Sequence, residues 1–579
     1  MAWHGWGQWI VRIAWAGAIA GMGWAVGAEA NRAEEFDLFS APDTGKTTLK
    51  PLRSSSVGPK GIDALRLHEA PYNLTGRKIA IGQVEIGRPG LFGVDKAVAA
   101  NHVMMLERVF YRDTDARQNA NVDSHAQNVA SVMISSAKAA KGVAPNARLF
   151  SSAAGTPRRY GQPEECLSAQ HIAMQNGGDV RAINLSFGES LRHDPRPTPV
   201  LDGKALLTLC IDWSARVHNV LYVVAGNQGK GGISIPTDNY NGVNVAFTTR
   251  VDELFARVDF ANIGDPASGA IEGIESNVGG RRAIALAAPG SEIAMVNPNG
   301  SIGVSSGTSF AAPHVTGTVA LLQEYGDAQL RSQCPVTASC PVSPSWTLDA
   351  RRAEVMKAVL LNAADKLQDT GDGLRLGMSR TIVDKANRSW PDLEAATNPA
   401  IPLNIQMGAG QLNAYRAYQQ FSAGQWAPTQ PLPPIGWDYH TVTYPEPAAG
   451  GMVQQGQDAF GPYRDYVLER PLKADSFVSV TLTWQRVVEL DDKNQNGVYD
   501  LGEDFRDRGL NNLDLYLMRA TDTDIRQSLG VSNSKLDNVE HLFQKIPATG
   551  RYKIRVYFRQ PVNSTTQPYA IAWWTVPTN

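Results

Sequence analysis

The sequence has almost no net charge, and beyond its first 30 residues it has no apolar run long enough to span a membrane. The 579 residues include 54 Lys and Arg and 56 Asp and Glu, a formal net charge of −2, which gives no electrostatic basis for binding nucleic acid. Only 19% of the residues are charged, but 43% are hydrophobic, so the low charge does not indicate a disordered chain. The chain exceeds the roughly 250–300 residues that one hydrophobic core usually serves, so we expect two domains.

The one long apolar run lies near the N-terminus. Arg12 precedes an Ala- and Gly-rich stretch at residues 13–26, and small residues follow at positions 26–30. This stretch is shorter than the ~20 residues that a membrane-spanning helix needs. We therefore predict a secretory signal peptide over residues 1–28, with a membrane anchor as the alternative, and no membrane span after its removal. Secretion would place the protein in the periplasm or outside the cell.

Cysteine is scarce, with four residues in the whole chain, Cys166, Cys210, Cys334 and Cys340. An oxidising compartment favours pairing. Cys334 and Cys340 could close a small loop, and Cys166 and Cys210 fall on two helices predicted to be neighbours. Four free thiols are the alternative, and the sequence leaves the connectivity open.

The sequence does contain a serine at the start of an apolar helix. Residues 307–315 read Gly-Thr-Ser-Phe-Ala-Ala-Pro-His-Val, and residues 315–322 are almost wholly apolar. Pro313 is compatible with a helix only in its first turn, where no backbone N–H is needed. Ser309 therefore lies beside unpaired N–H groups and the positive end of the helix dipole. A serine held in this way is a candidate nucleophile if the chain also supplies a base and a group that orients the base.

Candidates for these groups lie upstream, at the ends of predicted elements. One strand-like run ends at Glu85, a helix-like run begins near His125, and a further strand-like run ends two residues before Asn227. With this order of acid, histidine, asparagine and serine, the chain resembles the subtilase family of subtilisin-like serine peptidases. The Gly-Thr-Ser-x-Ala-x-Pro-His pattern is highly specific for that family, and shorter matches lie at residues 142–145, 183–188, 225–227 and 288–290.

The resemblance covers roughly residues 60–420. It implies a serine endopeptidase that acts on protein or peptide substrates without a catalytic cofactor, and we expect a monomer. Ser309 would attack the peptide carbonyl, His125 would take and return the proton, Glu85 would orient His125, and Asn227 would donate to the oxyanion.

A second segment of the chain resembles the part of the family that binds the substrate. Ser186, Phe187 and Gly188 match the family's substrate-binding segment, which would pair with the substrate backbone by strand addition. His314 also belongs to the family motif, and we assign it to packing in the core.

Two departures from the family pattern leave an alternative open. Glu85 stands where the family has aspartate, and His125 is followed by Ala-Gln-Asn-Val-Ala where the family has Gly-Thr-His-Val-Ala. Asp95 and Asp123 are rival carboxylates, although Asp123 is only two residues from His125 at a helix start, where side chains do not face each other. The alternative is a catalytically inactive subtilase-fold protein that binds or scaffolds other proteins.

Strand-like and helix-like runs alternate from residue 78 to about residue 413. This alternation predicts an α/β domain, the three-layer subtilisin-like fold with a mostly parallel sheet, with residues 352–367 as its last helix. Beyond a Pro-rich stretch, residues 477–484, 513–517 and 552–557 alternate with period two, which predicts an all-β, jelly-roll-like sandwich. The predicted organisation is a signal peptide at 1–28, an extended segment at 29–60, a peptidase domain at 61–425, a linker at 426–435 and a β-sandwich at 436–579.

An acidic loop in the second domain fits a calcium-binding pattern. Residues 492–503 have oxygen-bearing side chains at loop positions one, three, five, nine and twelve, with glycine at position six. No helices flank the loop, so we predict an EF-like loop within a β-hairpin, with an Asn- and Gly-rich turn as the alternative. The predicted ligands of a structural Ca²⁺ are Asp492, Asn494, Asn496, Val498 (through its backbone carbonyl), Asp500 and Glu503.

Overall fold

The computed structural model describes residues 55–98, 102–156, 161–189, 191, 194–226, 235–259, 277–278, 280–332, 346–445 and 462–578, to which the structural statements below refer. The predicted signal peptide, Asn227, Cys334 and Cys340 lie outside these residues. No helix within the described ranges combines the length and the apolar character needed to cross a bilayer.

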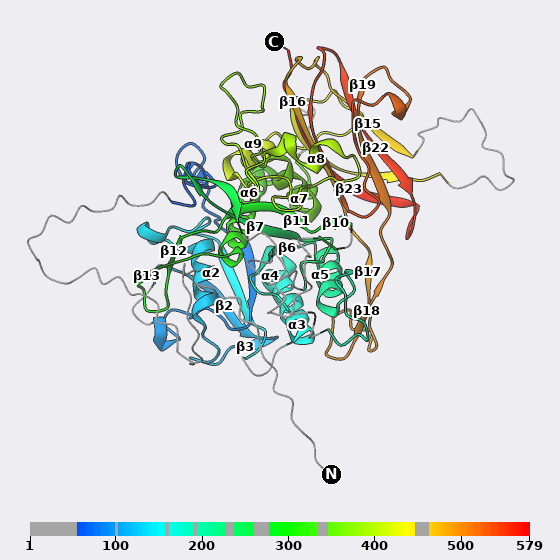
Figure 1. Ribbon diagram of the computed structural model, residues 1–579. Coiled ribbons are helices and arrows are strands. Elements are labelled where there is room, and N and C mark those ends of the chain that lie inside the picture. Colours follow the sequence, from blue (N-terminus) through cyan, green and yellow to red (C-terminus); the bar gives the residue numbers. More distant parts are fainter. Residues whose placement is uncertain are drawn as a thin grey trace, which may run out of the picture.

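A nine-stranded sheet forms the centre of the first part of the chain (Figure 1). Its order is β11-β7-β6-β5-β1-β4-β2-β3, with β8 paired to β7, and every pair is parallel except β2 with β3 and β7 with β8. The strands are β1 (Ala80–Glu85), β2 (Leu106–Tyr111), β3 (Thr114–Asp115), β4 (Arg148–Ala153), β5 (Val180–Leu185), β6 (Leu221–Ala225), β7 (Val243–Val251), β8 (Leu254–Asp259) and β11 (Ile284–Pro289). Two small antiparallel pairs flank it, β9 (Asn277–Val278) with β10 (Arg281–Arg282), and β12 (Ile293–Val296) with β13 (Ile302–Ser305).

Helices cover both faces of this sheet because its strands are apolar on both sides. Along β6, Leu221 and Val223 belong to the core that contains α2 and α6, whereas Tyr222 and Val224 belong to the core that contains α3 and α5. This arrangement confirms the predicted α/β fold class. The helices are α1 (Leu65–His68), α2 (Ser124–Ile134), α3 (Gln162–Ala173), α4 (Gln175–Gly178), α5 (Leu206–Val217), α6 (Thr308–Ser332), α7 (Ala353–Asn362), α8 (Glu394–Thr397) and α9 (Ala414–Ser422).

The prediction that residues 352–367 form the last helix of this part of the chain was wrong. Helix α7 stops at Asn362, and two further helices, α8 and α9, come later in the chain, of which α9 packs against α6 and α7. The helix stops because the backbone of Asp365 pairs with Gln411, with N···O distances of 2.8 and 2.9 Å in the two directions.

Two four-stranded antiparallel sheets make up the C-terminal part, in the orders β14-β23-β16-β21 and β15-β22-β19-β20. Their strands are β14 (Ile435–Thr443), β15 (Tyr463–Val467), β16 (Phe477–Trp484), β19 (Asn512–Arg519), β20 (Gly530–Ser532), β21 (Val539–Lys545), β22 (Tyr552–Gln560) and β23 (Thr566–Trp574). Both sheets contribute apolar side chains to one core. The hydroxyl-bearing residues of β16 face the other way: Ser479 Oγ donates to Asn362 Oδ1 at 2.9 Å and Thr483 Oγ1 donates to the Glu354 carbonyl at 3.0 Å. The first sheet therefore packs its outer face on α7.

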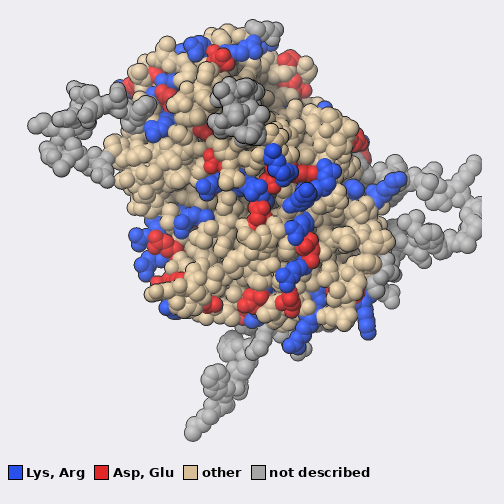
Figure 2. All heavy atoms as spheres, turned by 180° about the vertical axis from the view of Figure 1, so that it is seen from behind, with Lys and Arg blue, Asp and Glu red and all other residues tan. Residues whose placement is uncertain are grey.

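One hairpin, β17 (Val488–Asp491) with β18 (Asp504–Asp507), leaves these sheets and runs beside α5 (Figure 1). Arg486 anchors its base, because its guanidinium donates to the Asp212 carboxylate at 3.1 Å and to the Gly203 carbonyl at 2.7 Å. The loop at 492–503 therefore lies against the α/β part of the molecule. On the face seen in Figure 2, basic and acidic side chains lie among one another, in keeping with the small net charge.

Candidate active site

Glu85 and His125 meet at the carboxyl end of the central sheet. Glu85 is the last residue of β1 and its side chain is only 4% exposed, and His125 is the second residue of α2. His125 Nδ1 lies 3.4 Å from Glu85 Oε2. Burial raises the pKa of Glu85, while the adjacent His125 and the Ser186 backbone N–H lower it and Asp123 raises it. The net effect raises the pKa of Glu85, and the contact with the histidine is the largest influence that opposes this rise.

Ser309 lies in the first turn of α6, as predicted from its sequence. Its side chain is buried, and its neighbour Phe310 places its ring 5.8 Å from the ring of His125, centroid to centroid. The turn before the helix is held by a 2.7 Å hydrogen bond from Gly307 N to the Gly290 carbonyl. A Cβ on Gly290 would lie 2.7 Å from the Gly307 oxygen and 2.3 Å from Phe247 Cβ, so the close approach requires glycine there.

Two hydrogen bonds join Ser186 and Ser309. Ser309 Oγ donates to the Ser186 carbonyl at 3.2 Å, and Ser186 Oγ donates to the Ser309 carbonyl at 2.9 Å and accepts from Asn184 Nδ2 at 2.8 Å. Thr308 Oγ1 donates to the Gly226 carbonyl at 2.6 Å, which joins the start of α6 to the end of β6. Sequence reasoning missed these pairings, because residues 123 positions apart give no local signal of their contact.

The two rival carboxylates are engaged elsewhere. Asp95 forms a two-point ion pair with Arg88, with N···O distances of 2.7 and 2.9 Å, and both side chains are fully buried. Asp123 is the N-cap of α2, and its Oδ1 accepts the backbone N–H of Ala126 at 3.0 Å. Of the three candidate acids, Glu85 is the one in contact with His125.

One of the unusual residues after His125, Gln127, has a structural explanation. Gln127 is buried, and its Oε1 accepts the N–H of Gly90 at 2.9 Å, which ties α2 to the segment that follows β1. Gln83 Nε2 donates to the Ala126 carbonyl at 2.9 Å from the strand side.

His314 has both ring nitrogens in hydrogen bonds, to the Phe310 carbonyl and to Ser56 Oγ, and burial lowers its pKa to about 4. This environment agrees with a packing role for His314.

Comparison with known proteins decides the family. The family model described as the subtilase family matches residues 55–379, more than half of the chain. The chain belongs to the subtilase family. Thermitase from Thermoactinomyces vulgaris is 24% identical over 324 residues, which cover 55% of this chain and 91% of thermitase. Subtilisin NAT from Bacillus subtilis subsp. natto is 25% identical over 299 residues, which cover 50% of this chain and 67% of that protein.

Solved structures similar to this subtilase include a mutant of the protease domain of PatA, at 20% identity and a TM-score of 0.39, covering 61% of this chain and 99% of that one. Another is a cold-adapted subtilisin-like serine proteinase, at 18% identity and a TM-score of 0.31, covering 44% of this chain and 78% of that one. Membership of the family makes this chain a serine endopeptidase.

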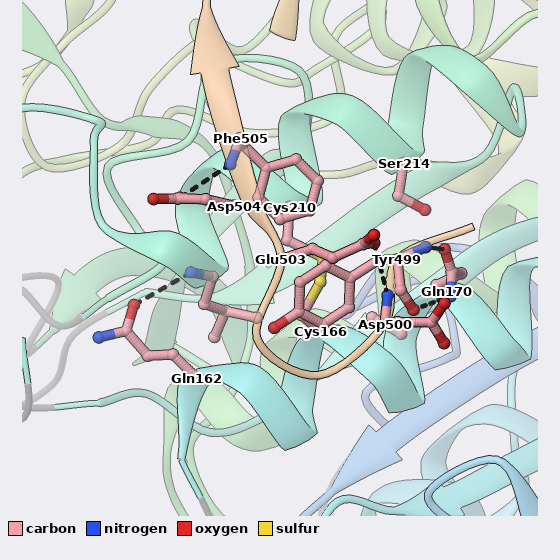
Figure 3. Close-up of a disulfide and its surroundings, with 12 residues drawn as sticks. Gln162, Cys166, Gln170, Cys210, Ser214, Tyr499, Asp500, Glu503, Asp504 and Phe505 are labelled. Atoms are coloured by element: carbon pink, nitrogen blue, oxygen red, sulfur yellow. Dashed lines mark hydrogen bonds between the residues drawn. A yellow bond between two sulfur atoms is a disulfide. The ribbon is translucent and has the colours of Figure 1, made fainter. Parts of the chain in front are cut away.

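The subtilase has a disulfide between Cys166 of α3 and Cys210 of α5. Figure 3 shows Tyr499 and Phe505 of the β17–β18 hairpin beside it. Gln170 of α3 bonds the hairpin in both directions: its Oε1 accepts from Tyr499 N at 2.5 Å and its Nε2 donates to the Tyr499 carbonyl at 3.0 Å. The two helices are thus joined covalently to each other and by hydrogen bonds to the C-terminal part.

The predicted calcium loop closes the β17–β18 hairpin, as expected from its flanking strands. Its side chains bond within the loop: Asp492 accepts the N–H groups of residues 495–497, and Asp500 Oδ2 accepts from the Asn494 and Asn496 amides at 2.6 and 2.7 Å. Within the described ranges, no three His, Cys, Asp or Glu side chains form a metal-binding group. The oxygen donors match what Ca²⁺ prefers, and the two asparagines would have to turn their amide oxygens inward to bind it.

Proposed function

We propose that this subtilase hydrolyses peptide bonds through Ser309, His125 and Glu85, with Asn227 as an oxyanion donor. The observation that carries the proposal is the 3.4 Å contact between His125 Nδ1 and Glu85 Oε2, with His125 beside the residue that follows Ser309. Glutamate reaches the histidine in place of aspartate because it ends its strand facing the start of α2. Ser-His-acid groups with glutamate occur on other folds, so the longer side chain is compatible with this chemistry.

The proposed reaction is acyl transfer. Rotation about the Cα–Cβ bond of Ser309 moves its hydroxyl from the Ser186 carbonyl toward His125, which takes the proton as the oxygen attacks the substrate carbonyl. His125 then gives this proton to the leaving amine as the C–N bond breaks, and a water molecule deprotonated by His125 hydrolyses the acyl-enzyme and frees Ser309. The Glu85 carboxylate stabilises the resulting imidazolium. The Asn227 amide and the Ser309 backbone N–H donate to the oxyanion, and loss of one such donor typically costs about 3 kcal/mol in the transition state. The substrate backbone lies along Ser186, Phe187 and Gly188.

Active-site labelling of the full-length protein with a fluorophosphonate tests this proposal without knowledge of the substrate. We expect one adduct, which peptide mass spectrometry places on Ser309. Ser309→Ala should abolish labelling, and Ser306→Ala is the matched control, since this serine accepts from Glu292 N three residues before the nucleophile. A correctly folded parent protein that takes no label would favour the inactive binding or scaffolding protein.

We also propose that the protein is secreted or periplasmic. The disulfide between Cys166 and Cys210 supports this, because such bonds persist in oxidising compartments and are rare in the cytosol. Cell fractionation followed by mass analysis of the N-terminus tests it. A mature chain that begins near residue 29 is expected, and a cytosolic protein that retains residues 1–28 would contradict it.

A structural Ca²⁺ held by Asp492, Asn494, Asn496, Val498, Asp500 and Glu503 completes the proposal. Such an ion would neutralise the loop's carboxylates and order the hairpin that packs on α3 and α5. An ion that binds only the folded state raises the free energy of unfolding by about 2.7 kcal/mol at a hundredfold excess over its dissociation constant.

Thermal melting of the full chain with calcium and with chelator tests this site. Asp492→Ala should lose part or all of the calcium-dependent rise in melting temperature. Asp491→Ala is the matched control, because Asp491 is exposed, adjacent and paired with Arg506 at 3.5 Å outside the loop pattern. Equal calcium responses in the two variants would rule out the site.

A further inference from the structure

A second buried carboxyl lies on the opposite side of the substrate-binding segment from Glu85. Ser186 directs its side chain toward Ser309, and in an extended chain alternate residues point to opposite sides. Phe187 accordingly packs, half-buried, on the core that contains α3 and α5. The backbone of Glu189 pairs with Ile235, at N···O distances of 2.7 and 2.9 Å, and the Glu189 side chain contacts Glu165 of α3.

Glu165 is fully buried and its carboxyl interacts with the second carboxyl, that of Glu189, while among the described residues neither of its oxygens accepts a hydrogen bond from a nitrogen donor. Ser168, one turn further along α3, is also fully buried, and its hydroxyl has no partner within the same ranges. Unpaired buried polar groups of this kind are rare because removing them from water without compensation is unfavourable. An ionised carboxylate is the most unfavourable case, since it needs a positive charge beside it.

Two of the described neighbours of Glu165 are also carboxylates, Glu189 and Glu164. Burial raises the pKa of Glu165 well above its ordinary value, and Glu189 and then Glu164 raise it further. Arg112 pairs with the preceding residue of the helix, Glu164, at 3.4 Å. The position of Glu165 is fixed from the other side, because Cys166 is disulfide-bonded to α5 and Gln170 is bonded to Tyr499.

We propose that Glu165 is a specificity-determining residue that selects a basic side chain of the peptide substrate at the subsite beside Phe187. A Lys or Arg side chain has an apolar stem that can pack against Phe187, Leu167 and Leu191, and its charged end would reach the Glu165 carboxyl. The Phe187 ring can also interact with the cation through its face. The arriving charge would ionise Glu165 and donate hydrogen bonds to its oxygens. This inference rests on the proposed function, since it concerns the same substrate-binding segment.

The test compares two sets of quenched fluorescent peptides with the full-length enzyme. The sets are identical except that one scans arginine, and the other scans its neutral isostere citrulline, through each position on the acyl side of the cleaved bond. We expect kcat/KM to be at least about tenfold higher for arginine than for citrulline at one position. Glu165→Gln should reduce that ratio to near one, and Glu165→Asp should retain part of it.

Glu164→Gln is the matched control, since it removes the same charge from the preceding residue of the helix and should leave the ratio intact. Equal kcat/KM for arginine and citrulline at every position would overturn the inference while leaving the proposed function standing. So would a folded Glu165→Gln variant with the parent's ratio. If Glu165→Gln does not fold, the ratios of the parent and of Glu165→Asp decide. Failure of the proposed function is distinguishable, because the parent protein would then cleave neither set and take no fluorophosphonate label.

Discussion

Two buried glutamates contact the stretch at residues 186–189, Glu85 at Ser186 and Glu165 at Glu189, and they differ in the charge of their main neighbour. Glu85, 3% exposed, contacts His125, whereas Glu165, fully buried, contacts a second carboxyl, that of Glu189. Burial raises the pKa of both. The histidine opposes that rise at Glu85, and Glu189 adds to it at Glu165. The two carboxyls therefore differ in the neighbouring group rather than in the degree of burial, which is the basis for proposing different roles for them.

The largest expected effect is at Glu85. Glu85→Gln keeps the length of the side chain but presents an amide that can hold His125 in the wrong tautomer. The comparable acid-to-amide change in another serine protease lowers turnover by roughly 10⁴-fold. A loss of this size corresponds to an increase of about 5.5 kcal/mol in the activation barrier. We expect a loss of this order in single-turnover acylation. Glu85→Asp keeps the charge and should retain more activity.

Asp123→Asn is the control for this series, because asparagine caps a helix about as well as aspartate. Its acylation rate should stay within about tenfold of the parent, under roughly 1.4 kcal/mol. If Asp123→Asn or Asp95→Asn loses acylation while folded Glu85→Gln keeps it, the orienting acid has been assigned wrongly.

The next largest expected effect is a loss of stability on removal of the disulfide that holds α3, the helix that carries Glu165. Cys166 and Cys210 are separated by 44 residues, and closing a loop of that length removes chain entropy from the unfolded state worth about 4 kcal/mol. The double variant Cys166→Ala, Cys210→Ala should lose free energy of unfolding of this order in denaturant titration of the full chain. The parent in reducing agent should move toward the same value. Unchanged stability in both would mean that the hairpin and the cores hold α3 without the bond.

The smallest expected effect is on the pH dependence of stability, which should differ between variants of the two glutamates. The pKa of Glu165 is higher in the folded protein than in the unfolded chain, so the folded state binds a proton that the unfolded state has released. The contribution of Glu165 to the free energy of unfolding is therefore greatest below about pH 4.3. This contribution falls as pH rises toward the pKa of the folded state, by up to about 1.4 kcal/mol per pH unit. Glu165→Gln removes this loss.

Melting curves of the parent and Glu165→Gln between pH 4 and pH 8 measure the difference. The variant should gain melting temperature relative to the parent as pH rises. Glu85→Gln should show a smaller gain, since His125 offsets part of the rise in the pKa of Glu85. Equal gains for the two variants would mean that burial alone sets both pKa values.

Much of the fold and part of the site follow from local patterns. The run predicted at residues 477–484 is strand β16 with those bounds, and the run predicted to end two residues before Asn227 is β6, which ends at Ala225. Ser309 lies in the first turn of α6, as the positions of Pro313 and Gly307 predict. Period and capping act over a few residues, so a sequence records them directly. The end of α7 at Asn362 was not predictable in this way, because it depends on a backbone pairing with Gln411, far along the chain.

The sequence by itself determined the family motif, the α/β and all-β halves, and the order of the candidate catalytic residues. Only the tertiary structure decided that Glu85 rather than Asp95 or Asp123 contacts His125, that Cys166 pairs with Cys210, and that Tyr499 docks on Gln170. It also decided that Glu165 and Glu189 share one buried site. The physical reason is that these contacts join residues of separate elements. Their proximity comes from how sheets and helices pack, and no spacing along the chain encodes it.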